Sequence, residues 1–199
     1  GKFTSLSGSV VYNSTDGITW TYKALPVGSA FKALCYGNGM YVSFNWNSMR
    51  NLLYSTDGEN WTSTSISLPS SVSSGSCRYV CYGKGRFVAV NSTSYCVYST
   101  DGMNWEASMI SDTIAHWVGV CYGNGLFVAT ALNTNKAAYS EDGISWTLFD
   151  LPITDNWTSI CYGNGRFVAL SNSGSAAVAP ITSASSTMKI TAHGQLQST

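Results

Sequence analysis

Acidic side chains are the first candidates for chemistry in this chain, because two suitably placed carboxylates can hydrolyse a glycosidic bond. Four of the ten acids recur at one position of the motif SxDGxxW, and they are Asp16, Asp57, Asp101 and Asp142. Three glutamates lie in or beside these motifs, which leaves Asp112, Asp150 and Asp155. These three have loop-type neighbours and no apolar surroundings that would raise a carboxyl pKa. We therefore expect the chain not to be an enzyme.

Histidines offer little metal chemistry. The chain has two of them, His116 and His193, which are too few and too separate in the sequence for a convincing metal site. We expect neither a metal nor another cofactor.

Composition excludes several classes of partner. The ten basic and ten acidic residues cancel, so the chain has no net positive charge to attract nucleic acid or an anionic membrane. No apolar run reaches the length of about eighteen residues that a membrane span needs, so no membrane insertion is expected. Only 10% of the residues are charged. A surface that is polar without being ionic suits neutral hydroxylated ligands such as sugars.

The elements that carry these residues repeat at a fixed period. The SxDGxxW aspartates follow one another at steps of 41, 44 and 41 residues, and a second phrase, CYGxG, recurs in phase with them. Each unit contains short segments rich in Val, Tyr, Phe and Thr, separated by Gly, Asn, Asp and Pro, which is typical of strands and tight turns. The pattern predicts an all-β chain with about 42 residues, or four strands, in each repeat. The Asp of each motif is expected to hold a turn.

These motifs resemble the Asp-box, or BNR repeat, of bacterial-neuraminidase-type β-propellers, although that family usually has one more residue, as SxDxGxxW. Together with "YGNGRFVAV" the array is similar to repeats in phage tail fibres and in gut-bacterial or prophage proteins. The resemblance covers residues 9–178 and implies a propeller of four-stranded antiparallel blades. A sialidase of this family would need an arginine triad, and none can be assembled from the four arginines, Arg50, Arg78, Arg86 and Arg166.

The resemblance yields a map of five blades, at about residues 1–25, 30–66, 76–110, 116–151 and 156–178. The first blade lacks its first strand and the last lacks its fourth. The tail, residues 179–199, contains "TMKITAHGQLQ", which could supply a missing strand and close the ring. The alternative is that the chain is a piece of a longer propeller or fibre.

Cysteine positions argue against a disulfide framework. Four occupy the equivalent position of CYGxG, namely Cys35, Cys81, Cys121 and Cys161, and propeller repeats hold equivalent residues farther apart than the roughly 7 Å between Cα atoms that a disulfide tolerates. Cys77 and Cys96 are free to pair, and the sequence leaves that open. Mostly free thiols favour synthesis in a reducing bacterial cytoplasm.

A binding site is expected on the face opposite the repeated turns, where the loops vary among the repeats. Three tryptophans there could stack on sugar rings, Trp46, Trp117 and Trp157, although the last two could instead pack between blades. The polar companions expected to bond hydroxyl groups are Asn45, Asn47, Arg50, Asn91, His116, Asn133, Asn135 and Asp155.

These features predict a non-catalytic propeller module that binds carbohydrate or a receptor, as the head of a phage tail fibre or tail-like particle. The expected partner is a cell-surface glycan or host receptor, the expected location is a virion tail or the extracellular space, and homo-oligomers through a fibre are conceivable. The first alternative is a structural spacer without a ligand site. The second is a degenerate sialidase-like or other glycoside hydrolase.

Overall fold

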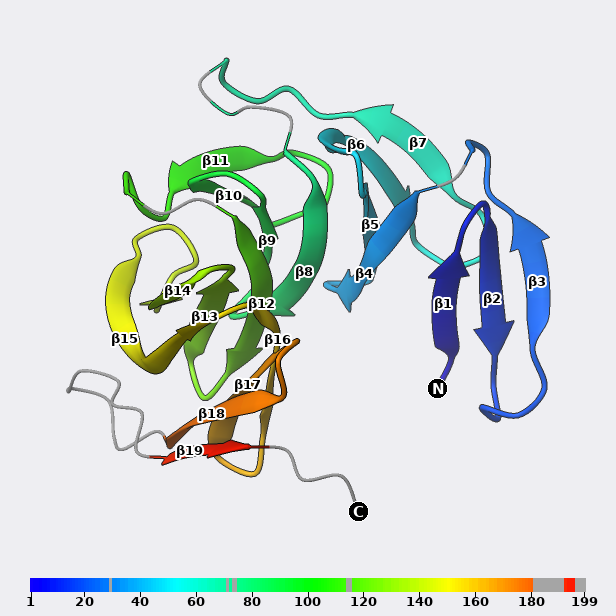
Figure 1. The fold of residues 1–199 in the computed structure, drawn as a ribbon. Coiled ribbons are helices and arrows are strands. Elements are labelled where there is room, and N and C mark those ends of the chain that lie inside the picture. The colour runs from blue at the N-terminus through cyan, green and yellow to red at the C-terminus, as the bar shows by residue number, and fades with distance from the viewer. Residues whose placement is uncertain (29, 71, 73–74, 114–115, 181–191, 196–199) are drawn as a thin grey trace.

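The computed structural model describes residues 1–28, 30–70, 72, 75–113, 116–180 and 192–195. These residues form five antiparallel sheets arranged about a common centre as an open ring, which is a β-propeller (Figure 1). The first sheet has three strands and each of the others has four. The strands are β1 Phe3–Ser7, β2 Val10–Ser14, β3 Thr21–Ala24, β4 Phe31–Gly37, β5 Met40–Asn45, β6 Ser48–Ser55, β7 Thr62–Ser65, β8 Cys77–Gly83, β9 Arg86–Asn91, β10 Tyr95–Ser99, β11 Glu106–Met109, β12 Trp117–Gly123, β13 Leu126–Ala131, β14 Thr134–Ser140, β15 Thr147–Asp155, β16 Trp157–Gly163, β17 Arg166–Ser171, β18 Ser175–Pro180 and β19 Ala192–Gln195.

Both repeated phrases make turns. In the CYGxG phrase the two residues between the strands have positive φ, for example 48° at Asn38 and 75° at Gly39. Two consecutive positive φ values are what a type I′ hairpin requires, and Asn and Gly adopt them at little cost. The motif glycines also have positive φ, such as 72° at Gly58. Hairpins at both phrases keep consecutive strands antiparallel neighbours within one sheet.

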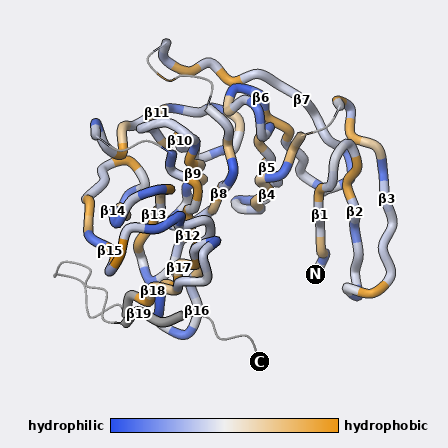
Figure 2. Tube along the Cα trace, viewed as in Figure 1, coloured by the Kyte–Doolittle hydropathy of each residue, from blue (hydrophilic) through white to orange (hydrophobic). Residues whose placement is uncertain are grey.

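The hydrophobic core lies between neighbouring sheets. Val42 and Phe44 of the second sheet pack with Phe87 and Trp105 of the third, and equivalent clusters join the later sheets. Apolar segments are accordingly spread over all five sheets in Figure 2 rather than collected in one layer. The first strands of the four complete sheets, β4, β8, β12 and β16, lie side by side in chain order. They form the inner wall of the ring.

The two ends of the array differ from the complete sheets. In the first sheet β1 lies at the edge and pairs with β2, which pairs with β3. In the last sheet β19 pairs antiparallel with β18 as the fourth strand. The part of "TMKITAHGQLQ" that is described therefore extends its own sheet rather than closing the ring onto the first one. The rest of the predicted closing segment, residues 181–191 and 196–199, lies outside the described residues.

Candidate ligand-binding site

The loops that vary among the repeats lie on one face of the ring, here called the variable-loop face. It consists of the loops between the second and third strands, β5–β6, β9–β10, β13–β14 and β17–β18, and the connections that lead into β4, β8, β12 and β16. In every complete sheet the residue before the first strand accepts a backbone hydrogen bond from the neighbouring loop, as in Trp46 N–H to the Ala30 carbonyl (2.5 Å) and Leu132 N–H to the His116 carbonyl (3.2 Å). Loop and connection are therefore held together at this face.

A β-bulge begins each first strand and changes the direction of one side chain. The register shifts between Phe31 and Ala33 in the second sheet and between Cys77 and Tyr79 in the third, so Lys32 and Arg78 are the extra residues. A bulge turns a side chain away from its regular position in the pleat. The equivalent residues of the next two sheets are Val118 and Thr158, which carry no charge. A pair of cations therefore belongs to the second and third sheets alone.

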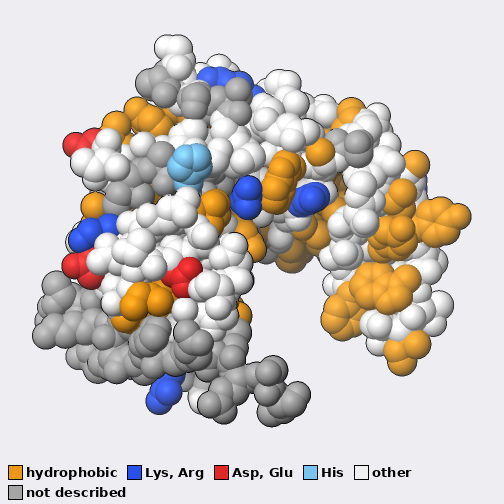
Figure 3. Space-filling view, viewed as in Figure 1, with side chains coloured by type: hydrophobic (Ala, Val, Ile, Leu, Met, Phe, Trp, Pro, Cys, Tyr) orange, Lys and Arg blue, Asp and Glu red, His pale blue; other side chains and the backbone are white. Residues whose placement is uncertain are grey.

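Both cations lie over Trp46, in the β5–β6 loop. The Lys32 Nζ and the Arg78 Cζ are each 4.5 Å from the centroid of its ring. Near the middle of the face in Figure 3, a hydrophobic side chain has a Lys or Arg side chain on each side, in agreement with these contacts. The two cations occupy space over the Trp46 ring that the expected stacking on a sugar ring would need. What the cluster offers instead is its charge.

The two cations have no carboxylate partner among the described residues. The Arg78 Nε is buried and has no hydrogen-bond partner among the residues that the structure describes. Because contact with an aromatic ring does not neutralise a cation, an anionic group placed beside Trp46 would interact with both charges. Sequence reasoning missed Lys32 and passed over Arg78, because a bulge has no clear signal in the residue pattern.

Four of the predicted polar companions have structural contacts near this cluster. The Asn45 Oδ1 accepts the Asn47 N–H at 2.8 Å and so shapes the loop. The Arg50 guanidinium donates to three carbonyls in the β7–β8 connection, at 2.9 to 3.2 Å, and so binds that connection. Asn91 is completely buried, and its Oδ1 accepts the Thr93 N–H at 3.0 Å. Of these residues only Asn47 is exposed next to Trp46.

Trp117 and Trp157 do not belong to a ligand site. Both side chains are 0% exposed, in clusters with neighbours such as Ala131 and Ala177. A side chain without exposed surface cannot contact a ligand on the face, so the packing role is the correct one for both.

The remaining predicted residues lie on the fourth and fifth sheets, and no described contact joins them to Trp46. His116 and Asn133 are exposed and have positive φ, 67° and 57°, whereas Asn135 is half-buried. Asp155 accepts a hydrogen bond from the Ser173 hydroxyl and another from the Asn156 N–H, and these bonds lower its carboxyl pKa to about 2. Asp155 therefore binds the β17–β18 loop and its own connection as a carboxylate.

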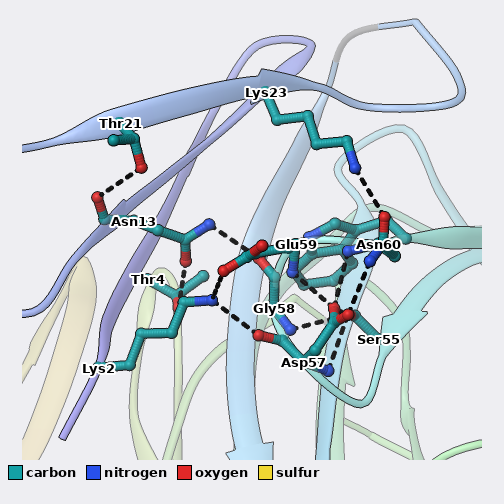
Figure 4. Close-up of polar contacts among 11 residues, drawn as sticks. Lys2, Thr4, Asn13, Thr21, Lys23, Ser55, Asp57, Gly58, Glu59 and Asn60 are labelled. Atoms are coloured by element: carbon teal, nitrogen blue, oxygen red, sulfur yellow. Dashed lines mark hydrogen bonds and ion pairs between the residues drawn. The ribbon is translucent and has the colours of Figure 1, made fainter.

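The opposite face carries the SxDGxxW boxes, whose aspartates hold turns. In the second sheet the Asp57 Oδ1 accepts the N–H groups of Glu59 and Asn60 at 2.8 and 2.7 Å (Figure 4). The other three boxes, with Asp16, Asp101 and Asp142, have the same pair of bonds. Figure 4 also shows Lys2 and Asn13 of the first sheet in contact with the box of the second. The boxes thus shape turns and join sheets.

These turn contacts predict a loss of stability in acid. The N–H groups of Ile18 and Thr19 lower the pKa of Asp16 from 3.8 to about 2, and those of Asn60 and Glu59 hold the pKa of Asp57 well below its usual range. The unfolded state therefore binds more protons than the folded state between about pH 4 and pH 2, so stability falls as the pH falls through this window. Thermal unfolding followed by circular dichroism should show a falling midpoint there. Asp57→Asn should have a shallower pH dependence, and a midpoint that stays constant over this window would contradict the assignment.

The described part of the chain has no metal-ligand cluster, no disulfide and no membrane-spanning helix. There, no set of three or more His, Cys, Asp or Glu side chains could hold a metal ion. All six cysteines are free, including Cys77 and Cys96. Among the described residues, no helix is long and apolar enough to cross a membrane.

Solved structures with a similar fold include YCF48 from Cyanidioschyzon merolae, which is 17% identical with a TM-score of 0.64 and coverage of 92% of this chain and 64% of that one. YCF48 bound to a D1 peptide is also 17% identical, with a TM-score of 0.62 and coverage of 85% and 56%. A catalytically inactive virginiamycin B lyase from Staphylococcus aureus, solved with quinupristin, is 14% identical, with a TM-score of 0.75 and coverage of 92% and 62%. This chain thus spans less than two thirds of each, and at these identities the likeness concerns the fold alone.

Sequence comparison gives a family. A search of the curated proteins finds no match to this chain. The family model of the DUF6242 beta propeller domain matches residues 23–162, from the third strand of the first sheet to the inner strand of the last. That match covers more than half of the chain and agrees with the sheets described above. The chain therefore belongs to the DUF6242 beta propeller domain family.

Proposed function

We propose that this propeller is a non-catalytic binding module that recognises an acidic glycan on a bacterial surface, as the receptor-binding head of a phage tail fibre or tail-like particle. The observation that carries the proposal is the pair of cations, Lys32 and Arg78, over Trp46 on the variable-loop face. A carboxylate of the glycan would interact with these charges, and Asn47 would bond neighbouring hydroxyl groups.

The rest of the molecule supports this function in two ways. Only 10% of the residues are charged and the formal net charge is zero, which favours a hydroxylated ligand over nucleic acid. The free cysteines fit synthesis in a reducing cytoplasm before assembly into an extracellular particle. Because YCF48, a propeller of similar fold, has been solved with a bound D1 peptide, an acidic peptide segment of a host receptor is the alternative ligand. A structural spacer would bind neither.

The test is binding of the fluorescently labelled chain to an array of bacterial glycans, in which each acidic glycan is matched with its neutral counterpart, and to whole cells. We expect saturable binding to acidic glycans that weakens with salt. Lys32→Gln should weaken it about tenfold, which corresponds to about 1.4 kcal/mol. Trp46→Ala should abolish it without a change in circular dichroism. Lys84→Gln is the matched control, because Lys84 lies in the β8–β9 hairpin turn on the face of the boxes.

Three results would overturn the proposal. Equal binding to neutral and acidic glycans would remove the role of the cations. No binding to glycans or cells would favour the structural spacer. Reducing ends released from a polysaccharide would show a glycoside hydrolase.

A further inference from the structure

Along the inner wall of the ring, tyrosine rings of successive sheets lie against glycines of the sheets before them. We call this row of contacts the Tyr–Gly ladder, or the ladder. Each CYGxG phrase places a Tyr and a Gly at the end of a first strand, and the Tyr ring lies against the Gly of the preceding sheet. A Cβ atom built on Gly37 would be 2.1 Å from the Tyr82 Cγ, and one on Gly83 would be 2.0 Å from the Tyr122 Cγ. Gly123 has the same relation to Tyr162. Glycine at these positions is what allows neighbouring sheets to approach.

Among the described residues, the ladder stops with an unfilled place at each end. Tyr36, in the second sheet, has no first strand beside it in the preceding sheet, and it is 56% exposed. At the other end, a Cβ built on Gly163 would meet no described atom within 4 Å. Figure 3 shows a wide hollow between the first sheet and the last. In the part of the chain that the structure describes, the Tyr36 ring has no glycine against it, and Gly163 has no tyrosine ring against it.

The first sheet has the place for the missing strand. In each complete sheet the strand that ends in CYG pairs antiparallel with the next strand along the chain, as β4 pairs with β5 and β8 with β9. The equivalent of β5 and β9 in the first sheet is β1, which is the edge strand of its sheet and contacts β4, the strand that carries Tyr36. An edge strand presents backbone N–H and C=O groups that another strand can pair with.

We propose that the free edge of β1 binds one further strand of the CYGxG type, antiparallel to β1, with its glycine against the ring of Tyr36. The strand would continue the inner wall formed by β4, β8, β12 and β16. Main-chain hydrogen bonds would give affinity, and the glycine would give specificity, since any side chain there would overlap the ring.

A folded second copy of this chain does not fit the place. Each of its CYGxG strands is already paired with its own neighbour in a four-stranded sheet. The bound segment is therefore an extended one, with a CYGxG strand that is not yet paired in a sheet of its own.

The probe is a synthetic peptide with the sequence of residues 117–125, WVGVCYGNG, kept reduced and titrated into the full chain. We expect saturable one-to-one binding by calorimetry and slower hydrogen exchange of the β1 amides on addition of peptide. A peptide with Gly123→Val should bind at least about tenfold more weakly, as should the chain variant Tyr36→Ala. Tyr22→Ala is the control, because Tyr22 is exposed on β3, at the far edge of the same sheet. Circular dichroism would establish that both chain variants are folded.

Several outcomes would overturn this inference. The β1 edge is not the site if the peptide fails to bind, or if it slows exchange at β3 instead of β1. Binding that is indifferent to both Tyr36→Ala and Gly123→Val would exclude the ladder as its basis. Slow β1 exchange without peptide, together with a dimer in sedimentation, would assign the edge to a second copy instead.

Discussion

Replacing Gly83 with alanine is expected to destabilise the chain by about 3 kcal/mol or more, among the largest effects of any single methyl group in this fold. The new Cβ would lie 2.0 Å from the Cγ of Tyr122 and 2.3 Å from its Cδ1. These atoms belong to the base of a ring that packs 4.8 Å from Phe127, between ring centroids, so the ring has little freedom to move aside. Relief would require neighbouring sheets to separate, which would open the inner wall.

Gly163→Ala is the matched control, since Gly163 has the same repeat position in the last sheet. Its Cβ would meet no described atom within 4 Å, so we expect a change within about 1 kcal/mol and of either sign. Urea unfolding followed by circular dichroism would measure both variants. Similar losses from Gly83→Ala and Gly163→Ala would show that the cost comes from the glycine backbone and not from the Tyr ring.

The repeated residues made the fold predictable from the sequence. SxDGxxW recurs in the first four sheets and CYGxG in the last four, because these sheets share the same turns and the same close contact between neighbours. Their period therefore indicated the number and type of sheets. The fourth strand of the second sheet begins directly after the box Trp, at Thr62.

The candidate site was harder to predict, because it depends on residues that break the repeat. Lys32 and Arg78 have no charged equivalents in the later sheets, and only the bulge places them at the Trp46 ring. For Trp117 and Trp157 the prediction of a ligand contact was wrong for the reverse reason, because they occupy a repeated position and not an exposed site. Both begin inner strands, where a propeller buries both faces of a strand between neighbouring sheets, so an aromatic residue at a loop boundary need not be exposed.

Trp105→Ala is expected to destabilise the chain by about 3 to 5 kcal/mol, the range for removing a buried aromatic side chain. Trp105 is 6% exposed and lies between two sheets, with its ring 4.7 Å from Phe44 in an edge-to-face arrangement and 6.2 Å from Phe87, between centroids. Its indole N–H donates to the Gly102 carbonyl at 3.1 Å. Truncation would remove both aromatic contacts and this bond.

Trp20→Ala changes the same position of the first box and separates the two contributions. The Trp20 indole N–H also donates to its motif glycine, Gly17, at 3.2 Å, but the side chain is 42% exposed. Because less apolar area is buried, we expect a loss of only about 1 kcal/mol, measured by the same urea unfolding. A loss as large as that of Trp105→Ala would mean that the bond within the box, rather than packing between sheets, is the main contribution of the repeated tryptophan. We expect the larger loss for Trp105→Ala because Trp105 packs against the preceding sheet. Trp20 directly precedes β3 of the first sheet, at the open end of the ring, and its side chain is therefore exposed.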